Sequence, residues 1–191
     1  MTDPDNPQGH KLPPYVAWLL DRRDEQAVRV ALRRGGVAEL DAGAVRYLAP
    51  FWGSETWKRT PTLLHASLAT TYPLAHEDGV PLGRMLAGLA AEKRAEGGEA
   101  EDRMAGRLAT VQRLALPVAH KVLASFFPMA VSSGLTLDWR DLYWAYLKWD
   151  HPDSTKRYAT RRKLLEDFVW RPTSPTPPDH PSTNHAAPAA S

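Results

Sequence analysis

The chain has 191 residues, 43% of them hydrophobic and 24% charged, which is typical of a globular protein long enough to bury a core. It contains no cysteine, which excludes disulfides and thiolate metal sites, and no apolar stretch approaches the roughly 20 residues of a membrane span. The net charge is only +2, but residues 103–163 carry 11 Lys and Arg against 4 Asp and Glu. This basic segment suggests a polyanionic partner, although a solvated helical surface would have the same composition.

Proline and glycine mark helix boundaries in the first half of the chain. Asp24 can cap a helix that Gly35 ends. Pro50 marks a corner, Pro61 suits the first turn of a helix, and Pro73 predicts a kinked last turn. These signals predict helices over Tyr15–Leu20, Glu25–Arg34, Ala42–Leu48, Pro61–Ala75 and Pro81–Ala95.

The second half shows the same helical pattern, without sustained alternation of polar and apolar residues. An apolar stripe with helical spacing consists of Met104, Leu108, Val111 and Ala115. Pro117 can begin a helix that Pro128 kinks, and Asp138 can cap the one after it. These features predict helices starting near Glu101, from Pro117 to Ser133, from Asp138 to Trp149, and from Asp153 or Ser154 to Trp170.

Both ends of the chain are rich in proline, with four in residues 1–14 and six in residues 171–191. Such segments have too little apolar content to offset the entropy of ordering, so we predict disordered tails. The N-terminal tail also shows no signal-peptide pattern. The predicted fold class is all-α, with two small helical bundles over residues 15–97 and 98–170.

The placement of arginine is the main functional signal. Arg29 and Arg33 are four residues apart on one helical face, and Arg103 and Arg107 repeat this spacing, with Arg113 at the edge of their face. Further basic residues are Lys121 and those of the segment Lys156–Lys163, which has five in eight residues. Arginines from several helices can form a groove for a phosphate backbone, because the guanidinium fork grips two oxygens at once. The alternative is that they pair with Asp and Glu of neighbouring helices.

Aromatic residues concentrate between Trp139 and Trp149. Most of them share one helical face, and we interpret that face as core rather than as a platform for stacking bases. Trp144 lies on the other side with Arg140 and Lys148; if any aromatic residue of this segment contacts a partner, we expect it to be Trp144.

Motifs for catalysis are weak or missing. His65 and His76 are eleven residues apart, near one helical face, but no third metal ligand is evident. The glycine pairs have the positions of helix stops and not of a phosphate-binding loop. We therefore predict a protein that is not an enzyme and that needs no cofactor or metal.

Five separated motifs, in this order, resemble the CasB family, the small subunit of the type I-E CRISPR surveillance complex called Cascade. The motifs are Ala31-Leu32-Arg33-Arg34-Gly35, Tyr47-Leu48-Ala49-Pro50-Phe51-Trp52, Pro81-Leu82-Gly83-Arg84, Leu137-Asp138-Trp139 and Leu164-Leu165-Glu166-Asp167-Phe168-Val169. The resemblance covers about residues 15–170. It implies two helical bundles, a cytoplasmic location and no chemistry.

The resemblance also implies partners: the guide RNA (crRNA), the target and displaced DNA strands, other Cascade subunits and a second copy of the chain, but no membrane. Carried over residue by residue, the nucleic-acid face comprises Arg33, Arg34, Arg46, Arg103, His120, Lys121, Arg157 and Arg161, to which spacing adds Arg29, Arg107 and Arg113. His120 departs from the family, in which this position is usually basic. The competing hypothesis is a helical adaptor that binds only proteins.

Overall fold

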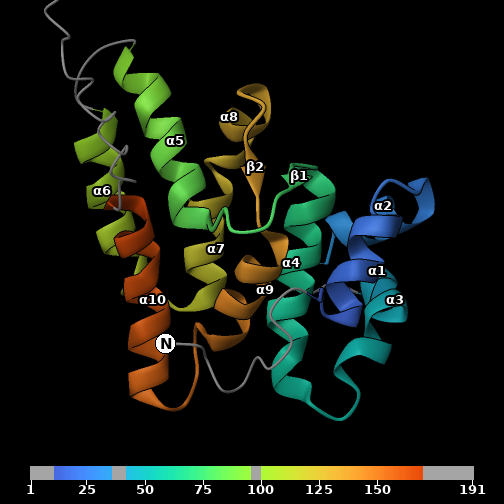
Figure 1. Cartoon of the computed structure of the whole chain (residues 1–191). Helices are drawn as coiled ribbons and strands as arrows, with labels where there is room; N and C mark the ends of the chain where they lie inside the picture. Colours follow the sequence, from blue (N-terminus) through green and yellow to red (C-terminus); the bar gives the residue numbers. More distant parts are fainter. Residues whose placement is uncertain (1–10, 36–41, 96–99, 170–191) are drawn as a thin grey trace, which may run out of the picture.

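The structure, a computed structural model, describes residues 11–35, 42–95 and 100–169. Helices dominate this part of the chain, as the sequence predicts (Figure 1). The elements are α1 (Pro14–Arg22), α2 (Gln26–Arg33), α3 (Ala42–Trp52), the short 3₁₀ helix η2 (Thr56–Lys58), α4 (Arg59–Thr71), β1 (Ala75–His76), α5 (Leu82–Ala95), α6 (Ala100–Val111), α7 (Leu116–Ala124), α8 (Phe127–Ser132), β2 (Thr136–Leu137), α9 (Trp139–Lys148) and α10 (Ser154–Val169).

Helix α4 lies at the centre of the described residues. Its residues from Pro61 to Ala66 are all buried, because α2 and α3 pack on one side of it and α7 and α9 on the other. Figure 1 shows α1, α2 and α3 on one side of the molecule and α5, α6 and α10 on the opposite side. The buried apolar residues of both sides belong to one continuous core.

Helices α5 and α10 pack closely at Gly83. A Cβ atom placed there would lie 2.4 Å from the Leu164 carbonyl oxygen and 2.6 Å from Cβ of Asp167. Only glycine allows the two backbones to approach this closely. The third and fifth family motifs, far apart in the sequence, therefore meet in space.

The strands β1 and β2 form a short parallel pair immediately before α9. In it, Ala75 pairs with Thr136 and His76 with Leu137. The chain then enters α9 through Asp138, whose carboxylate accepts hydrogen bonds from the backbone nitrogens of Arg140 and Asp141 at 3.0 Å. The predicted Asp138 cap is thus confirmed.

Four predicted helix boundaries are wrong. The N-cap of α2 is Glu25, not Asp24, and it makes no side-chain cap bond. Pro50 lies inside α3 rather than at a corner; its missing N–H leaves one backbone carbonyl to solvent at an exposed position. Helix α4 ends at Thr71 because Pro73 disfavours helical geometry at the preceding residue, and Tyr72 has φ −127° and ψ 86°.

The fourth concerns the helix predicted from Pro117 to Ser133, which is divided into α7 and α8. Pro128 lies in the first turn of α8 instead of kinking a longer helix. The predicted disordered tails fall almost entirely on residues 1–10 and 170–191, outside the described residues. The predicted boundary near residue 97 also falls outside them, and the division into bundles at that point stays a prediction.

Candidate nucleic-acid interface

Four exposed cations on α6, on α7 and between them form what we call the α6–α7 basic surface: Arg103, Arg107, Arg113 and Lys121. Helix α6 buries Met104, Leu108 and Val111 against the core, and this amphipathic spacing turns Arg103 and Arg107 outward. The first turn of α6 contains the acidic residues Glu101 and Asp102. Their negative charges interact favourably with the positive end of the helix dipole.

Arg107 shows how the two helices are joined. Its guanidinium donates to the Ser125 hydroxyl at 3.1 Å and lies 4.5 Å from the ring centroid of Phe126. Lys121 is one turn before Ser125, so these contacts bring Arg107 and Lys121 to neighbouring positions across the helix pair. A charge on each of two packed helices can follow a phosphate backbone.

His120, which precedes Lys121, does not share this exposure. Its Nδ1 lies 3.0 Å from the Tyr146 hydroxyl. Burial, with a smaller contribution from the charge of Lys121, lowers the pKa of His120 to about 4. The imidazole is therefore neutral at pH 7, and Lys121 is the cation of this pair.

The two arginines predicted on α10 are engaged within the protein. Arg157 donates to the His151 carbonyl at 2.7 Å. Arg161 donates to the carbonyls of Trp149 and Gln112 at 2.9 and 3.0 Å and to the Asp150 carboxylate at 2.6 Å. These bonds tie α10 to the ends of α9 and α6, so Arg161 has a structural role in the described protein.

The remaining predicted residues form a separate group on α2 and α3. Arg33 donates to the Thr70 carbonyl at 3.3 Å, and Arg46 donates to the Tyr47 hydroxyl at 2.9 Å. Arg34 is exposed and Arg29 is half-buried. The described structure thus gathers Arg103, Arg107, Arg113 and Lys121, but it places α2 and α3 on the opposite side of the molecule from α6 (Figure 1).

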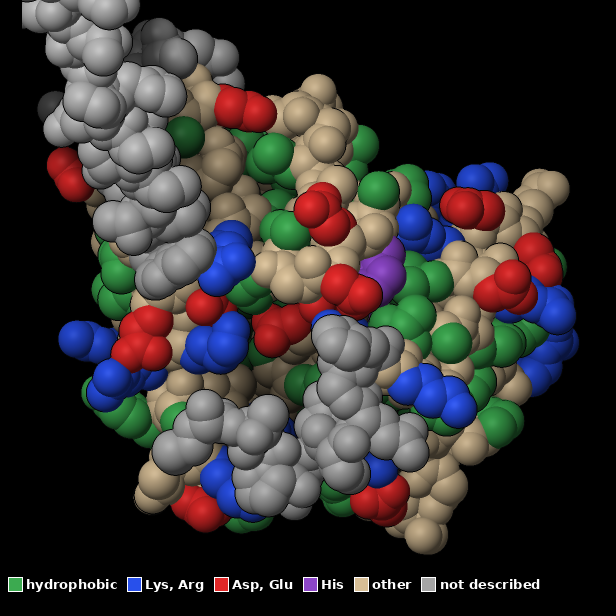
Figure 2. Space-filling model, in the orientation of Figure 1, with side chains coloured by type: hydrophobic (Ala, Val, Ile, Leu, Met, Phe, Trp, Pro, Cys, Tyr) green, Lys and Arg blue, Asp and Glu red, His purple; other side chains and the backbone are tan. Residues whose placement is uncertain are grey.

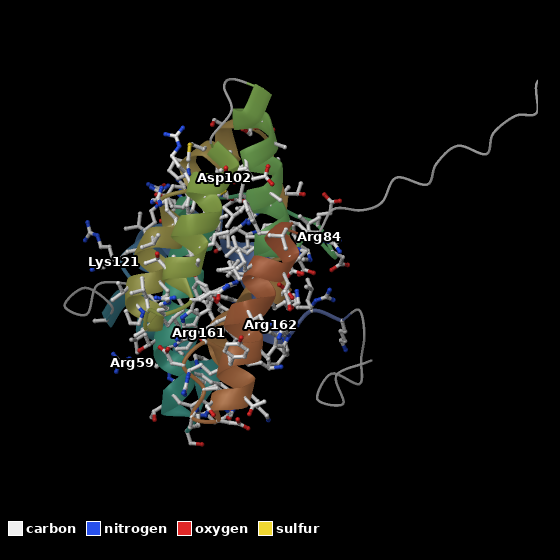
Figure 3. The ribbon with its side chains drawn as sticks, turned by 90° about the vertical axis from the view of Figure 1, so that its left-hand side faces the viewer. Arg59, Arg84, Asp102, Lys121, Arg161 and Arg162 are labelled. Atoms are coloured by element: carbon white, nitrogen blue, oxygen red, sulfur yellow. The ribbon has the colours of Figure 1, made fainter. Side chains whose placement is uncertain are left out.

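Other cations lie on a mixed surface. On α10, Arg162 pairs with Glu166, and Lys163 pairs with Asp167. The face in Figure 2 accordingly shows blue and red side chains close together over α10 and the centre of the molecule. Figure 3 shows Arg84 and Arg162 on one side and Lys121 and Arg59 on the other. The α6–α7 basic surface is therefore distinct from the face on which the charges of α10 are paired.

Between Trp139 and Trp149, the aromatic side chains are buried or exposed much as the sequence predicts. Trp139, Tyr143 and Tyr146 are buried, whereas Trp144 is 38% exposed and lies beside Lys148. Sequence reasoning missed Trp57, which is 55% exposed. No local pattern marks it, because its surroundings include residues of α7 and α9.

Among the described residues, His65 and His76 have different surroundings. His65 is fully buried; its Nε2 donates to the Trp139 carbonyl at 2.9 Å, so its Nδ1 accepts from the Tyr15 hydroxyl at 3.0 Å. Burial lowers the pKa of His65 to about 3. It is a neutral core residue that joins α1, α4 and α9.

His76 lies elsewhere, with Asp78 and Asp138, and one potential ligand atom of each lies within 4.8 Å of the others. The guanidinium of Arg140 occupies this cluster, 3.3 Å from the Asp78 carboxylate and 3.0 Å from that of Asp138. Asp138 also receives the Gly79 N–H and caps α9. An internal cation and helix N–H groups therefore already satisfy these carboxylates.

Comparison with known proteins decides the family. The model of the family described as CRISPR-associated protein Cse2 matches residues 28–168. The chain belongs to the Cse2 family. This membership confirms the resemblance to CasB, and a search of curated proteins gave no significant match.

A solved structure has the same fold as this Cse2 chain. A chain of a "CRISPR RNA-guided surveillance complex" is similar to it with a TM-score of 0.61 and 22% identity, over 81% of this chain and 91% of that chain. None of the described helices combines the length and the hydrophobicity of a membrane span.

Proposed function

We propose that this Cse2 chain is the non-catalytic small subunit of a type I-E Cascade complex and that it binds nucleic acid without sequence preference. The α6–α7 basic surface carries this proposal. It presents four exposed cations from two packed helices and the turn between them, and contacts of this kind to phosphates carry no direct sequence information. Family membership supports the antiviral setting.

Within the complex, this surface would contact the guide RNA, the target strand or the displaced DNA strand. Other Cascade subunits and a second copy of the chain would complete the groove. We place Arg103, Arg107, Arg113 and Lys121 at its centre. Arg34 and Arg46 on the other side of the chain would make further contacts, and a cytoplasmic location follows from this role.

A fluorescence-anisotropy titration tests the proposal. Labelled single- and double-stranded DNA and RNA would be titrated with the full chain at two salt concentrations. We expect binding that falls steeply with salt, because bound cations displace condensed counterions. The double variant Arg103→Ala/Lys121→Ala should weaken binding to all sequences alike.

The matched control is Arg84→Ala/Arg162→Ala, which also removes two positive charges, but from the other side of the molecule (Figure 3). If both double variants lost affinity equally, net charge and not the α6–α7 basic surface would account for binding. Absence of binding at low salt would favour the adaptor hypothesis, in which the chain contacts only proteins. In that case a heparin column would retain it no more than its charge predicts.

A further inference from the structure

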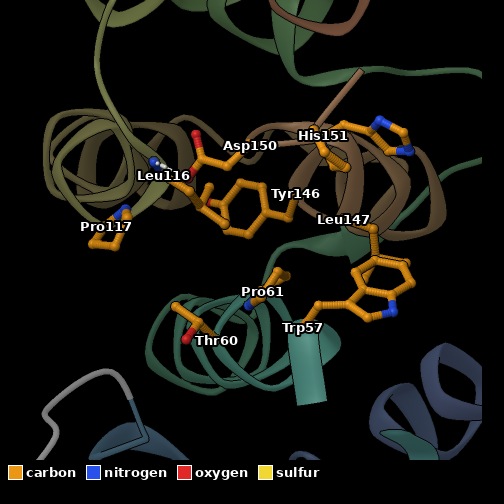
Figure 4. Close-up of a pocket in the computed structure, with 10 residues that line it drawn as sticks. Trp57, Thr60, Pro61, Leu116, Pro117, Tyr146, Leu147, Asp150 and His151 are labelled. Atoms are coloured by element: carbon orange, nitrogen blue, oxygen red, sulfur yellow. Dashed lines mark hydrogen bonds between the residues drawn. The ribbon is translucent and has the colours of Figure 1, made fainter. Parts of the chain in front are cut away.

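A pocket of about 720 Å³ opens between the start of α4 and the adjoining ends of α7 and α9 (Figure 4). Buried Pro61, Leu116, Tyr146 and Leu147 form its floor. The exposed residues of its rim are Trp57, Thr60, Pro117, Asp150 and Pro152. The volume is in the range of small-ligand sites, which are mostly apolar with a few polar groups.

The charges around the pocket favour an anionic occupant. The acidic group in its lining, Asp150, is compensated, because it accepts from the Leu116 backbone N–H at 2.8 Å and from Arg161 at 2.6 Å. Lys121 is one turn beyond Pro117 along α7, on the same helical face. Arg59 is exposed next to the rim residue Thr60, and Figure 3 shows it on the same side as Lys121.

The shape and lining favour a flat aromatic occupant. Trp57 is more than half exposed, yet it stands at the edge of the cavity, with Nζ of Lys58 5.3 Å from its ring centroid. Proteins that bind single strands combine such a ring, on which a base stacks, with cations along the backbone. Thr60 and His151 add polar groups that can meet the edge of a base.

We propose that this pocket binds an unpaired nucleotide, whose base stacks on Trp57 and whose flanking phosphates lie toward Lys121 and Arg59. The inference rests on the proposed function and adds a base-binding position to it. It predicts a preference for single strands at this position, because a paired base has its face covered by its neighbours.

The test compares two labelled strands of equal length, oligothymidine and the corresponding abasic strand, which keeps the phosphates and lacks the bases. Trp57→Ala should lower the affinity of the full chain for oligothymidine by about 5- to 150-fold, the range for removing one stacked base. The same variant should leave the affinity for the abasic strand unchanged. Trp57→Phe, which retains an aromatic face, should restore most of the binding.

The competing position is tested with Trp144→Ala, which removes another exposed tryptophan, the one that the sequence favours for a partner contact and that does not line the pocket. A base-dependent loss as large as that of Trp57→Ala would overturn the assignment to this pocket. An unchanged affinity of Trp57→Ala, or an equal loss on both strands, would also overturn the base-binding assignment. The expected occupant of the pocket would then be a protein segment. If the parent chain binds both strands equally with steep salt dependence, the proposed function stands and the base site fails; no binding to any strand overturns both.

Discussion

Helix α5 meets α10 with no room for one methyl group at Gly83, whereas α6 and α7 hold their cations in solvent. The first region contains two of the motifs that resemble the family, Pro81-Leu82-Gly83-Arg84 and Leu164-Leu165-Glu166-Asp167-Phe168-Val169. The second contains none of the five. These two motifs therefore contribute to the packing of α5 on α10, while the surface with which we associate function consists of exposed cations.

The largest expected effect is in the packed region. Gly83→Ala places a methyl group against the backbone of α10, which cannot move aside as a flexible side chain would, so the variant should lose about 1–3 kcal/mol of unfolding free energy or more. Urea denaturation measures this loss. The control is Gly106→Ala on α6, where a Cβ meets nothing within 4 Å and the better helix propensity should add about 0.5–1 kcal/mol. Equal stability of both variants would mean that α5 and α10 do not pack as described.

The second prediction concerns His65, which is buried on α4, and His120, which is half-buried on α7. The folded state lowers the pKa of His65 to about 3 and that of His120 to about 4, against an ordinary value of about 6.5. The unfolded chain therefore binds more protons between these values, and stability falls as the pH drops below about 6.5. Each histidine contributes up to about 1.4 kcal/mol per pH unit.

Denaturation at pH 7, 6 and 5 tests this slope. His120→Gln removes one titrating group and should make the loss between pH 6.5 and 5 shallower than in the parent. His151→Gln is the control, because no such contact with a buried tyrosine holds His151. The same pH dependence in the parent and in His120→Gln would show that His120 is not held neutral in the folded chain.

The third prediction separates a structural arginine from an exposed one. Arg161→Ala removes bonds to two carbonyls and a carboxylate from a side chain that is only 16% exposed. The expected loss is about 1.5–3 kcal/mol. Its neighbour Arg162 makes an exposed pair with Glu166, so Arg162→Ala should change the unfolding free energy much less than Arg161→Ala does. If Arg161→Ala instead weakened nucleic-acid binding without changing stability, its sequence-based place on the nucleic-acid face would be supported.

Local signals in the sequence predicted the helices and the Asp138 cap, because a cap and an amphipathic stripe depend on residues only a few positions apart. They did not predict the break between α7 and α8. The outward placement of Arg103 and Arg107 also followed from the apolar spacing of α6. This part of the candidate site could therefore be predicted without tertiary information.

Contacts between distant segments could not be predicted in this way. The need for glycine at position 83 arises from Leu164 and Asp167. The three partners of Arg161 lie just beyond the ends of α6 and α9. Burial lowers the pKa of His120 to about 4, and its sequence position beside Lys121 does not show that the side chain packs against Tyr146. Spacing alone cannot distinguish a guanidinium that binds a carbonyl of its own protein from one available to phosphate.

The smallest change in stability is expected for a substitution on the α6–α7 basic surface. There we expect an effect on nucleic-acid binding instead. Arg113 is exposed in the turn between α6 and α7, so Arg113→Ala should change the unfolding free energy by no more than about 0.5 kcal/mol. If it contacts one phosphate, the slope of log affinity against log salt should decrease by about 1 for every sequence tested. Arg22→Ala, which removes an exposed arginine paired with Asp21 and Glu25 on α1, should leave that slope unchanged. A smaller slope in both variants would assign the salt dependence to net charge, whereas a change confined to Arg113→Ala would locate the phosphate path on the surface that packing leaves exposed.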